Sequence, residues 1–159
     1  MAVDLWVPVA EYAACMACSA AMALIVLCDD EARIIPRGLC WLLAIAGIAL
    51  QGCAGGAPAI VVGAIWAVAF YLISCIALLL VDGRKGKEEP SLGGGDVRCM
   101  IALSLATGPG APIGSAACFA AAAIWAVVER VRRRMEAGEA FAFAPFLALW
   151  LVVGVLVAI

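Results

Sequence analysis

Six apolar runs, separated by short polar segments, make up most of this sequence. They cover residues 5–28, 39–54, 58–81, 97–107, 113–128 and 141–159. Of the 159 residues, 67% are hydrophobic and 14% are charged, which is more apolar surface than a soluble fold of this size can bury. About 20 helical residues cross the hydrocarbon core of a bilayer. The sequence therefore predicts an all-α polytopic membrane protein with about six transmembrane helices, and excludes a soluble secreted enzyme and a nucleic-acid-binding protein.

The sequence contains no histidine, which excludes a Ser-His-Asp triad, a Cys-His dyad and histidine-ligated zinc or haem. Of the eight cysteines, Cys15 and Cys18 form half of a metal or redox motif, but no second pair follows at zinc-site spacing. We interpret the cysteines as small apolar residues of helices, and we expect no metal and no cofactor. If the chain is a hydrolase, its carboxylates are the first candidates for acid and base.

The basic residues predict the orientation of the chain. All ten lie in three segments, which follow the first, third and fifth runs: Arg33 and Arg37; Arg84, Lys85, Lys87 and Arg98; Arg130, Arg132, Arg133 and Arg134. The turns after the second and fourth runs carry no charge. By the positive-inside rule, the three charged segments are cytoplasmic, and both the N-terminus and the C-terminus lie outside. The whole chain, 1–159, is expected to form one transmembrane domain.

The fourth run, 97–107, is the doubtful crossing, because a helix of that length spans only about 16 Å. If it did not cross, the basic residues 130–134 would lie outside, so we predict a short crossing helix. Its end must be sheltered by other helices or by water, because irregular backbone is not tolerated against lipid. Breakers predict a turn at each of the two uncharged connections. They are Gly52, Gly55, Gly56 and Pro58 after the second run, and the segment 108–112 after the fourth.

Two acidic residues stand where such a chain could carry out chemistry. Asp29 ends the first run and Asp96 begins the fourth, so an even number of crossings separates them and both lie at the same membrane face. Two neighbouring carboxylates do not ionise together easily, and such a pair can share one proton for acid and base work. Asp30 and Glu31 are expected to be solvated charges. The alternative for Asp96 is a structural one, because an acid after glycines can be only an N-cap.

Gly93, Gly94 and Gly95 precede Asp96. Residues without Cβ can adopt a positive φ and let backbone pass close to another chain. We expect them to present Asp96 at a helix N-terminus, whose partial positive charge favours a carboxylate.

These residues resemble the motifs of one family. Asp29, six residues and Pro36 resemble the D-x6-P element of type IV prepilin peptidases, which are intramembrane aspartic proteases. The segment 93–96 matches their G-x-G-D motif, and 143–148, which includes Pro145, resembles their late P-F-x-P-F-L segment. The resemblance covers roughly 20–159.

The resemblance implies an endopeptidase that cleaves the leader of prepilin-like substrates at the cytoplasmic face of a prokaryotic cytoplasmic membrane. Asp29 and Asp96 carry over as the catalytic pair, and Asp30 does not align. The motif or substrate-binding positions that carry over are Gly93, Gly95, Pro36, Arg98 and Pro145.

The chain departs from the family pattern at two basic residues. Arg37 follows Pro36 where Asn or Asp is common, and Arg98 stands where lysine is usual. The cysteine-rich insert of the methylating members is missing between the first two runs, so no methyltransferase activity is expected. The chain resembles the compact peptidases of tight-adherence (Flp-type) pili and the preflagellin peptidases. The alternatives are a small proton- or cation-coupled transporter and an inactive scaffold for pilus assembly.

Overall fold

The computed structural model describes residues 3–77, 79–80, 93–132 and 142–158, and contains no strand within these ranges. The helices are α1 (Val3–Ala32), α2 (Arg37–Ala54), α3 (Gly56–Ala77), α5 (Gly94–Thr107), α6 (Ala111–Val131) and α7 (Ala144–Ala158), with a 3-10 turn, η2 (Gly108–Gly110), between α5 and α6. Within the described residues, each of the six predicted apolar runs corresponds to one helix. The prediction of an all-α protein is confirmed.

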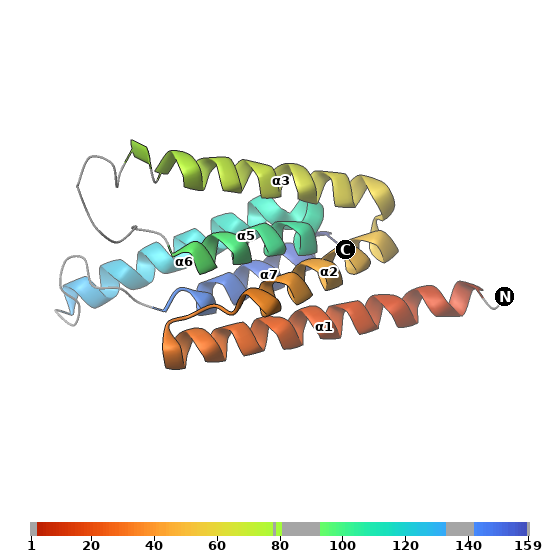
Figure 1. Cartoon of the computed structure of the whole chain (residues 1–159), viewed down its shortest axis with the longest axis horizontal. Helices are drawn as coiled ribbons and strands as arrows, with labels where there is room; N and C mark the ends of the chain where they lie inside the picture. The colour runs from red at the N-terminus through yellow and green to blue at the C-terminus, as the bar shows by residue number, and fades with distance from the viewer. Residues whose placement is uncertain (1–2, 78, 81–92, 133–141, 159) are drawn as a thin grey trace.

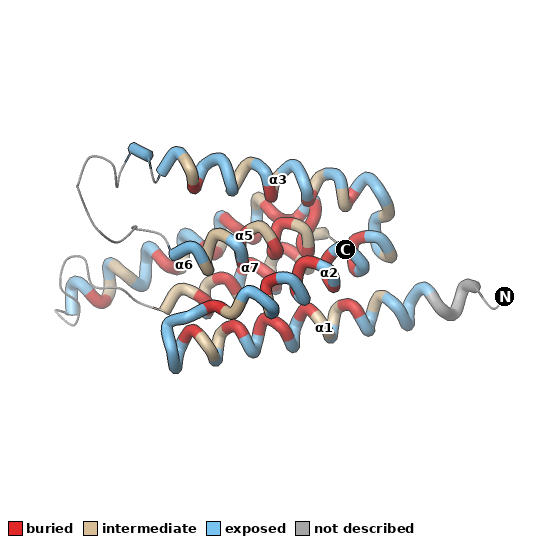
Figure 2. Tube along the Cα trace, in the orientation of Figure 1, coloured by how far each residue is buried: buried red, intermediate tan, exposed pale blue. Residues whose placement is uncertain are grey.

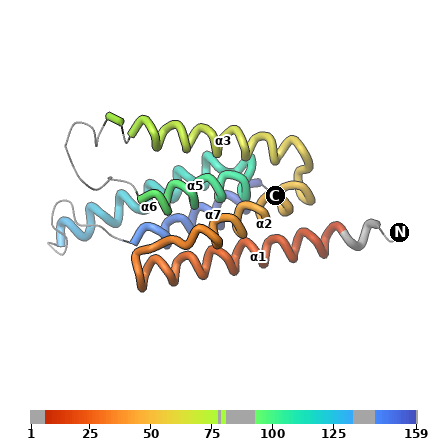
Figure 3. The backbone as a smooth tube through the Cα atoms, viewed as in Figure 1, coloured from red at the N-terminus to blue at the C-terminus, as the bar shows by residue number. Residues whose placement is uncertain are grey.

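The helices lie side by side and the chain runs back and forth along the bundle (Figures 1 and 3). One end of the bundle gathers the ends of α1, α3 and α6 with the beginnings of α2, α5 and α7. We call it the charged end, because Asp29, Arg37, Asp96 and Arg130 lie there. Both termini lie at the opposite end, together with the α2–α3 turn and η2. The basic residues 84–87 and 133–134 lie outside the described residues.

The surface of the bundle is apolar, as expected for helices in lipid. Four segments are long and apolar enough to cross a membrane: Val7–Ala32, Arg37–Ala54, Gly56–Ala77 and Gly94–Val131, and α7 is a shorter apolar helix. Large side chains such as Tyr12, Ile65, Ile124 and Leu156 are exposed on the outer faces, whereas buried residues line the inner faces (Figure 2). A soluble monomer does not expose so much apolar surface. This is the pattern of a multi-pass helical membrane protein.

The longest of these segments, Gly94–Val131, is not one straight helix. Its chain reverses at η2, so that α5 and α6 run in opposite directions (Figure 1). Pro109 and the glycines on either side of it break the helix, and Gly108 has a φ of 48°. A Cβ at Gly108 would lie 2.5 Å from Oε1 of Gln51. A residue without Cβ is therefore needed at this position for both reasons.

Helix α5 is the central helix, and it packs against α2, α3 and α7. Its last turn is covered by protein, as the sequence required. Gln51 of α2 donates through Nε2 to the carbonyl of Ala106 at 2.7 Å, and the Thr107 hydroxyl donates to the carbonyl of Leu103 at 2.8 Å. The indole N–H of Trp150, on α7, donates to Thr107 Oγ1 at 3.3 Å. These side chains satisfy polar groups that lipid would leave without partners.

The turn between α2 and α3 is tighter than the breakers indicated. Gly52 lies within α2 and Pro58 lies within α3, so that only the pair Gly55 and Gly56 reverses the chain. Gly56 has a φ of 66°, which glycine adopts without strain. Pro58 is tolerated because it stands in the first turn of α3, where its missing N–H has no helical partner in any case.

Close contact between α2 and α5 depends on Gly47. A Cβ at this position would lie 2.5 Å from the Cα and 2.6 Å from the Cβ of Ala106. Without a dominant hydrophobic force between helices in lipid, small residues at the crossing allow the van der Waals contacts that hold them together. Gly38, on the same helix, has nothing within 4 Å of the position of a Cβ.

These two glycines provide a matched test of the packing. Gly47→Ala is expected to destabilise the protein by about 1–3 kcal/mol, because α2 and α5 must separate to admit the methyl group. Gly38→Ala is expected to leave stability unchanged or to raise it by about 0.5–1 kcal/mol, since it only removes the entropic penalty of glycine in a helix. Thermal unfolding in detergent measures both. Equal effects of the two substitutions would contradict this account of the crossing.

Candidate active site

Asp29 lies in the last turn of α1 and faces the interior. It continues a buried stripe, Cys18, Met22 and Ile25, whose members are three or four residues apart and therefore share one helix face. Its exposed fraction is 7%, whereas Asp30, the next residue, is exposed. The two acids that are adjacent in sequence thus occupy opposite environments, and only Asp29 points into the bundle.

The Asp29 carboxylate caps a helix that is far away in the sequence. Its Oδ2 accepts a hydrogen bond of 3.0 Å from the backbone N–H of Ala144, the first residue of α7. The other amides of this turn are also accounted for, because Pro145 has no N–H and the N–H of Phe146 donates to the carbonyl of Phe143 at 3.0 Å. Pro145 thus lies in the first turn of α7, where proline is tolerated.

Asp96 is the third residue of α5, at the charged end of the bundle. Its carboxyl group is half-buried, is repelled by the charge of Asp29, and interacts with the backbone N–H of Gly93. The N-cap of α5 is Gly93, so Asp96 is not an N-cap; it reaches back to the cap as the third residue of a capping box does. The structure therefore brings Asp29 and Asp96 together from two separate helices.

The glycines before Asp96 present it in the first turn of α5, as expected, and they act through their lack of Cβ, since none of the three adopts the positive φ that glycine allows. Gly93 has a φ of −63°, and Gly94 and Gly95 lie within α5 with ordinary negative φ. A Cβ at Gly93 would lie 2.9 Å from Oδ2 of Asp96, and one at Gly95 would lie 3.0 Å from the Cβ of Ile35. Gly93 therefore leaves room for the Asp96 carboxylate itself, and Gly95 leaves room for Ile35.

The connection between α1 and α2 packs against the beginning of α5. Arg33 ends α1 in the left-handed region, with a φ of 54°, and its N–H donates to the carbonyl of Asp29 at 3.0 Å. Ile35 is buried against Gly95, and Pro36 is the N-cap of α2, where its extended backbone starts the helix. Pro36 thus helps to form the connection that joins Asp29 to the α5 terminus.

The remaining predicted residues lie around the pair. Pro145 is exposed, next to the amide that binds Asp29, and Arg98 is exposed and lines a groove between α2 and α5. Glu31 is exposed, as predicted. Asp82, Glu88 and Glu89, which the sequence also indicates as solvated charges, lie outside the described residues.

Two features of the charged end were missed from the sequence. The first is the amide of Ala144, although Pro145 had marked a helix N-terminus, which is where carboxylates are favoured. The second is Glu129, a buried acid of α6 that pairs with Arg132 at 3.9 Å. Its position beside the basic residues 130–134 concealed it, and its i,i+3 partner gives it a structural role.

Two carboxylates that approach each other from different helices, at the positive ends of α5 and α7, can hold and transfer a proton. They can also simply stabilise the two helix termini, since each of them interacts with a backbone amide there. No protein family, no characterised protein and no solved structure matches this chain. The choice between these roles therefore depends on the geometry of the pair and on the motifs around it.

Substitutions of Asp29 can distinguish the contribution of its charge from that of its hydrogen bond to the N–H of Ala144. Asp29→Ala removes the acceptor of a buried N–H and is expected to destabilise the protein by about 1–3 kcal/mol. Asp29→Asn keeps an acceptor oxygen and relieves the repulsion with Asp96, so its destabilisation should be smaller. Thermal unfolding in detergent measures both, with Asp30→Ala as the exposed control. If Asp29→Ala is as stable as Asp30→Ala, the hydrogen bond to Ala144 does not support α7.

Proposed function

We propose that this protein is an intramembrane aspartic endopeptidase that cleaves the leader peptide of type IV prepilin-like substrates. The observation that carries the proposal is the approach of Asp29 and Asp96, which are buried and half-buried, respectively, at one end of the bundle. Every motif that resembles the prepilin peptidases lies at this end as well, including Pro36, Gly93, Gly95 and Pro145.

The proposed reaction is general acid–base hydrolysis of a peptide bond. The pair holds one proton, and its ionised member takes a proton from a water molecule as the oxygen attacks the scissile carbonyl. The protonated member donates its proton to the carbonyl oxygen, and the tetrahedral intermediate then collapses with protonation of the leaving amine. Titration belongs to the pair, so neither aspartate is assigned a fixed role. Asp96 is the more accessible of the two, and substrate is expected to approach from its side.

The proposal includes an orientation in the membrane. All six helices cross the bilayer, with the charged end in the cytoplasm of a prokaryote and both termini outside. The basic residues at the charged end support this orientation. Helices α5 and α7 are short for a crossing, and neighbouring helices cover them. Helix α5 packs against α2, α3 and α7, and α6 packs against α7. The cleavage point would then lie at the cytoplasmic interface.

The main alternative, a proton- or cation-coupled transporter, is less well supported. Transporters place their ion sites near the middle of the bilayer, on interrupted helices. Here the two aspartates lie at an end of the bundle, whereas the interruption at η2 lies at the other end and is filled by Gln51 and Trp150 (Figure 1). An inactive scaffold would share the whole architecture, and only a measurement of cleavage separates it from a protease.

Substitution of each aspartate tests the proposed chemistry. Asp29→Asn and Asp96→Asn are each expected to reduce cleavage of a prepilin in membranes by at least about 100-fold, because an amide cannot exchange the proton. Asp30→Asn is the matched control, one residue away and exposed, and should retain most of the activity. Immunoblots of membrane fractions check that all three variants insert. An essential Asp30 with a dispensable Asp29 would show that the alignment to Pro36 is wrong by one position.

Reporter insertions test the orientation. A reporter placed after Arg132 is expected in the cytoplasm, and one placed between Gly55 and Gly56 is expected outside, because these sites lie at opposite ends of the bundle. A reporter fused after the last residue should also be outside. A cytoplasmic C-terminus would contradict the count of six crossings.

A further inference from the structure

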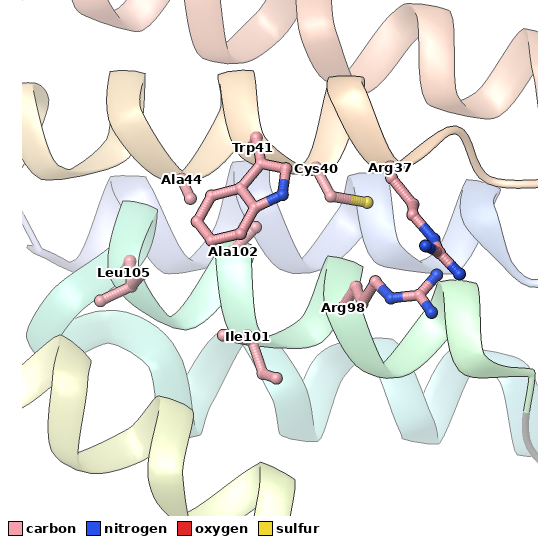
Figure 4. Close-up of a pocket in the computed structure, with 8 residues that line it drawn as sticks. All are labelled: Arg37, Cys40, Trp41, Ala44, Arg98, Ile101, Ala102 and Leu105. Atoms are coloured by element: carbon pink, nitrogen blue, oxygen red, sulfur yellow. The ribbon is translucent and has the colours of Figure 1, made fainter.

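A groove lies between α2 and α5, beside the candidate active site (Figure 4). Its volume is about 430 Å³, within the range of about 300–1,000 Å³ that is typical of ligand sites. Two guanidinium groups, from Arg37 and Arg98, lie at one end of the groove and point toward each other. The rest of the lining is apolar, with Trp41, Ile101 and Leu105 along the wall.

The two cations at the mouth of this groove are not neutralised by direct ion pairs among the described residues. Neither Arg37 nor Arg98 forms a salt bridge with any carboxylate there. Arg37 is also the first residue of α2, which has no acidic residue in its first turn. A positive side chain at the positive end of a helix is unfavourable unless an anion offsets it. Two such guanidinium groups together are suited to bind one anion, and phosphate matches their planar donors.

The two arginines are also the positions at which the chain departs from the pattern of the prepilin peptidases. Where that pattern has an amide or acid followed later by a lysine, this chain has two arginines, and the fold places them side by side. The two arginines that depart from the pattern therefore lie together at one end of the same groove.

The apolar part of the groove extends from the arginines toward the middle of the bundle. Ala44 follows Arg37 by two turns, and Leu105 follows Arg98 by two turns, so the groove runs about 10 Å along both helices. Its wall is open to the surroundings, since Trp41 is 70% exposed. A ligand that fits this shape has a negative headgroup at the charged end and an apolar chain below it.

We propose that this groove binds an anionic phospholipid, with its phosphate between Arg37 and Arg98 and an acyl chain along Trp41, Ile101 and Leu105. Basic pockets between transmembrane helices on the cytoplasmic side bind such headgroups. An anionic phospholipid has both the negative headgroup and the apolar chain. The proposed orientation places the groove at the membrane–water interface, where lipid headgroups lie. The lining of the groove includes neither Asp29 nor Asp96, so its occupancy does not depend on whether the protein cleaves peptides. The position of the headgroup at the interface rests on the proposed orientation.

Lipid binding to the purified full-length protein tests this site. Native mass spectrometry is used to titrate the protein with phosphatidylglycerol or with phosphatidylcholine of the same chain length. Wild type is expected to retain one phosphatidylglycerol at about tenfold lower lipid concentration than phosphatidylcholine. Arg37→Gln/Arg98→Gln should lose that preference. The matched control is Arg130→Gln/Arg133→Gln, which removes the same number of charges, leaves the Glu129–Arg132 pair intact and should keep the preference.

Two further variants address folding and the apolar wall. Arg37→Lys/Arg98→Lys keeps the charge but loses the planar donors, and should bind phosphatidylglycerol with intermediate affinity. Trp41→Ala should weaken binding of both lipids, because the acyl chain loses its wall. Unfolding temperatures of all variants show whether a loss of binding reflects a loss of fold.

Several results would overturn the assignment. Equal loss of preference in both glutamine double variants would indicate attraction to the charged end in general. Equal retention of the two lipids by wild type would exclude an anion site. If glycerol phosphate, which has no acyl chains, displaces phosphatidylglycerol at equal concentration, the site binds soluble phosphate. If an apolar helical peptide with one carboxylate displaces the lipid more effectively than lipid itself, the groove is a peptide site.

Discussion

The short central helix α5 is the constraint on which the rest of the structure depends. Its 14 residues rise about 21 Å, which is less than the hydrocarbon core of a bilayer. In the proposed membrane orientation, its last turn therefore ends short of the far membrane surface, where unsatisfied carbonyls cannot face lipid. Protein has to surround it, and α2, α3 and α7 do so, with Gln51 and the Trp150–Thr107 pair satisfying its polar groups. The central position of α5 in turn places its N-terminus, with Asp96, beside the end of α1.

The charged end is organised by carboxylates at helix N-termini. Asp29 binds the first amide of α7, and Asp96 interacts with the cap of α5. Both therefore lie at the positive end of a helix dipole, which offsets part of the unfavourable burial of charge. A site of this kind is stable enough to persist and is still strained by repulsion between the two acids. That combination suits proton transfer. The structural role of these residues and their proposed catalytic role are separated only by variants that keep the hydrogen bond and remove the charge.

Contact between the helices depends on residues without side chains at a few positions. Gly47 admits Ala106 of α5, and Gly114 admits the backbone of α7 at Trp150. Gly95 does the same for Ile35 at the candidate site. Close contact through a missing Cβ therefore occurs both within the bundle and at its charged end. The breakers in the sequence had indicated glycine as a source of unusual backbone, but among the glycines described only Gly56 and Gly108 have a positive φ. The sequence shows where glycines stand. Only the packing of the helices shows whether a glycine is needed for a positive φ or for the space left by its missing Cβ.

The sequence by itself determined the class of the fold, the apolar helices of the described residues and the end of the bundle at which each acid lies. These follow from simple properties, because the length of an apolar run sets the length of its helix, and an even number of helices between the two acids returns the chain to the same end of the bundle. The resemblance to the D-x6-P element pointed to Asp29 rather than Asp30, and Asp29 is the one that the structure buries. The orientation of Asp29 was decided only by the tertiary structure, since α1 is apolar on every face and its pattern does not reveal which face packs inward. The hydrogen bond from Ala144 and the meeting of Arg37 with Arg98 were likewise invisible, because each joins residues of separate helices whose relative rotation depends on the packing of the whole bundle.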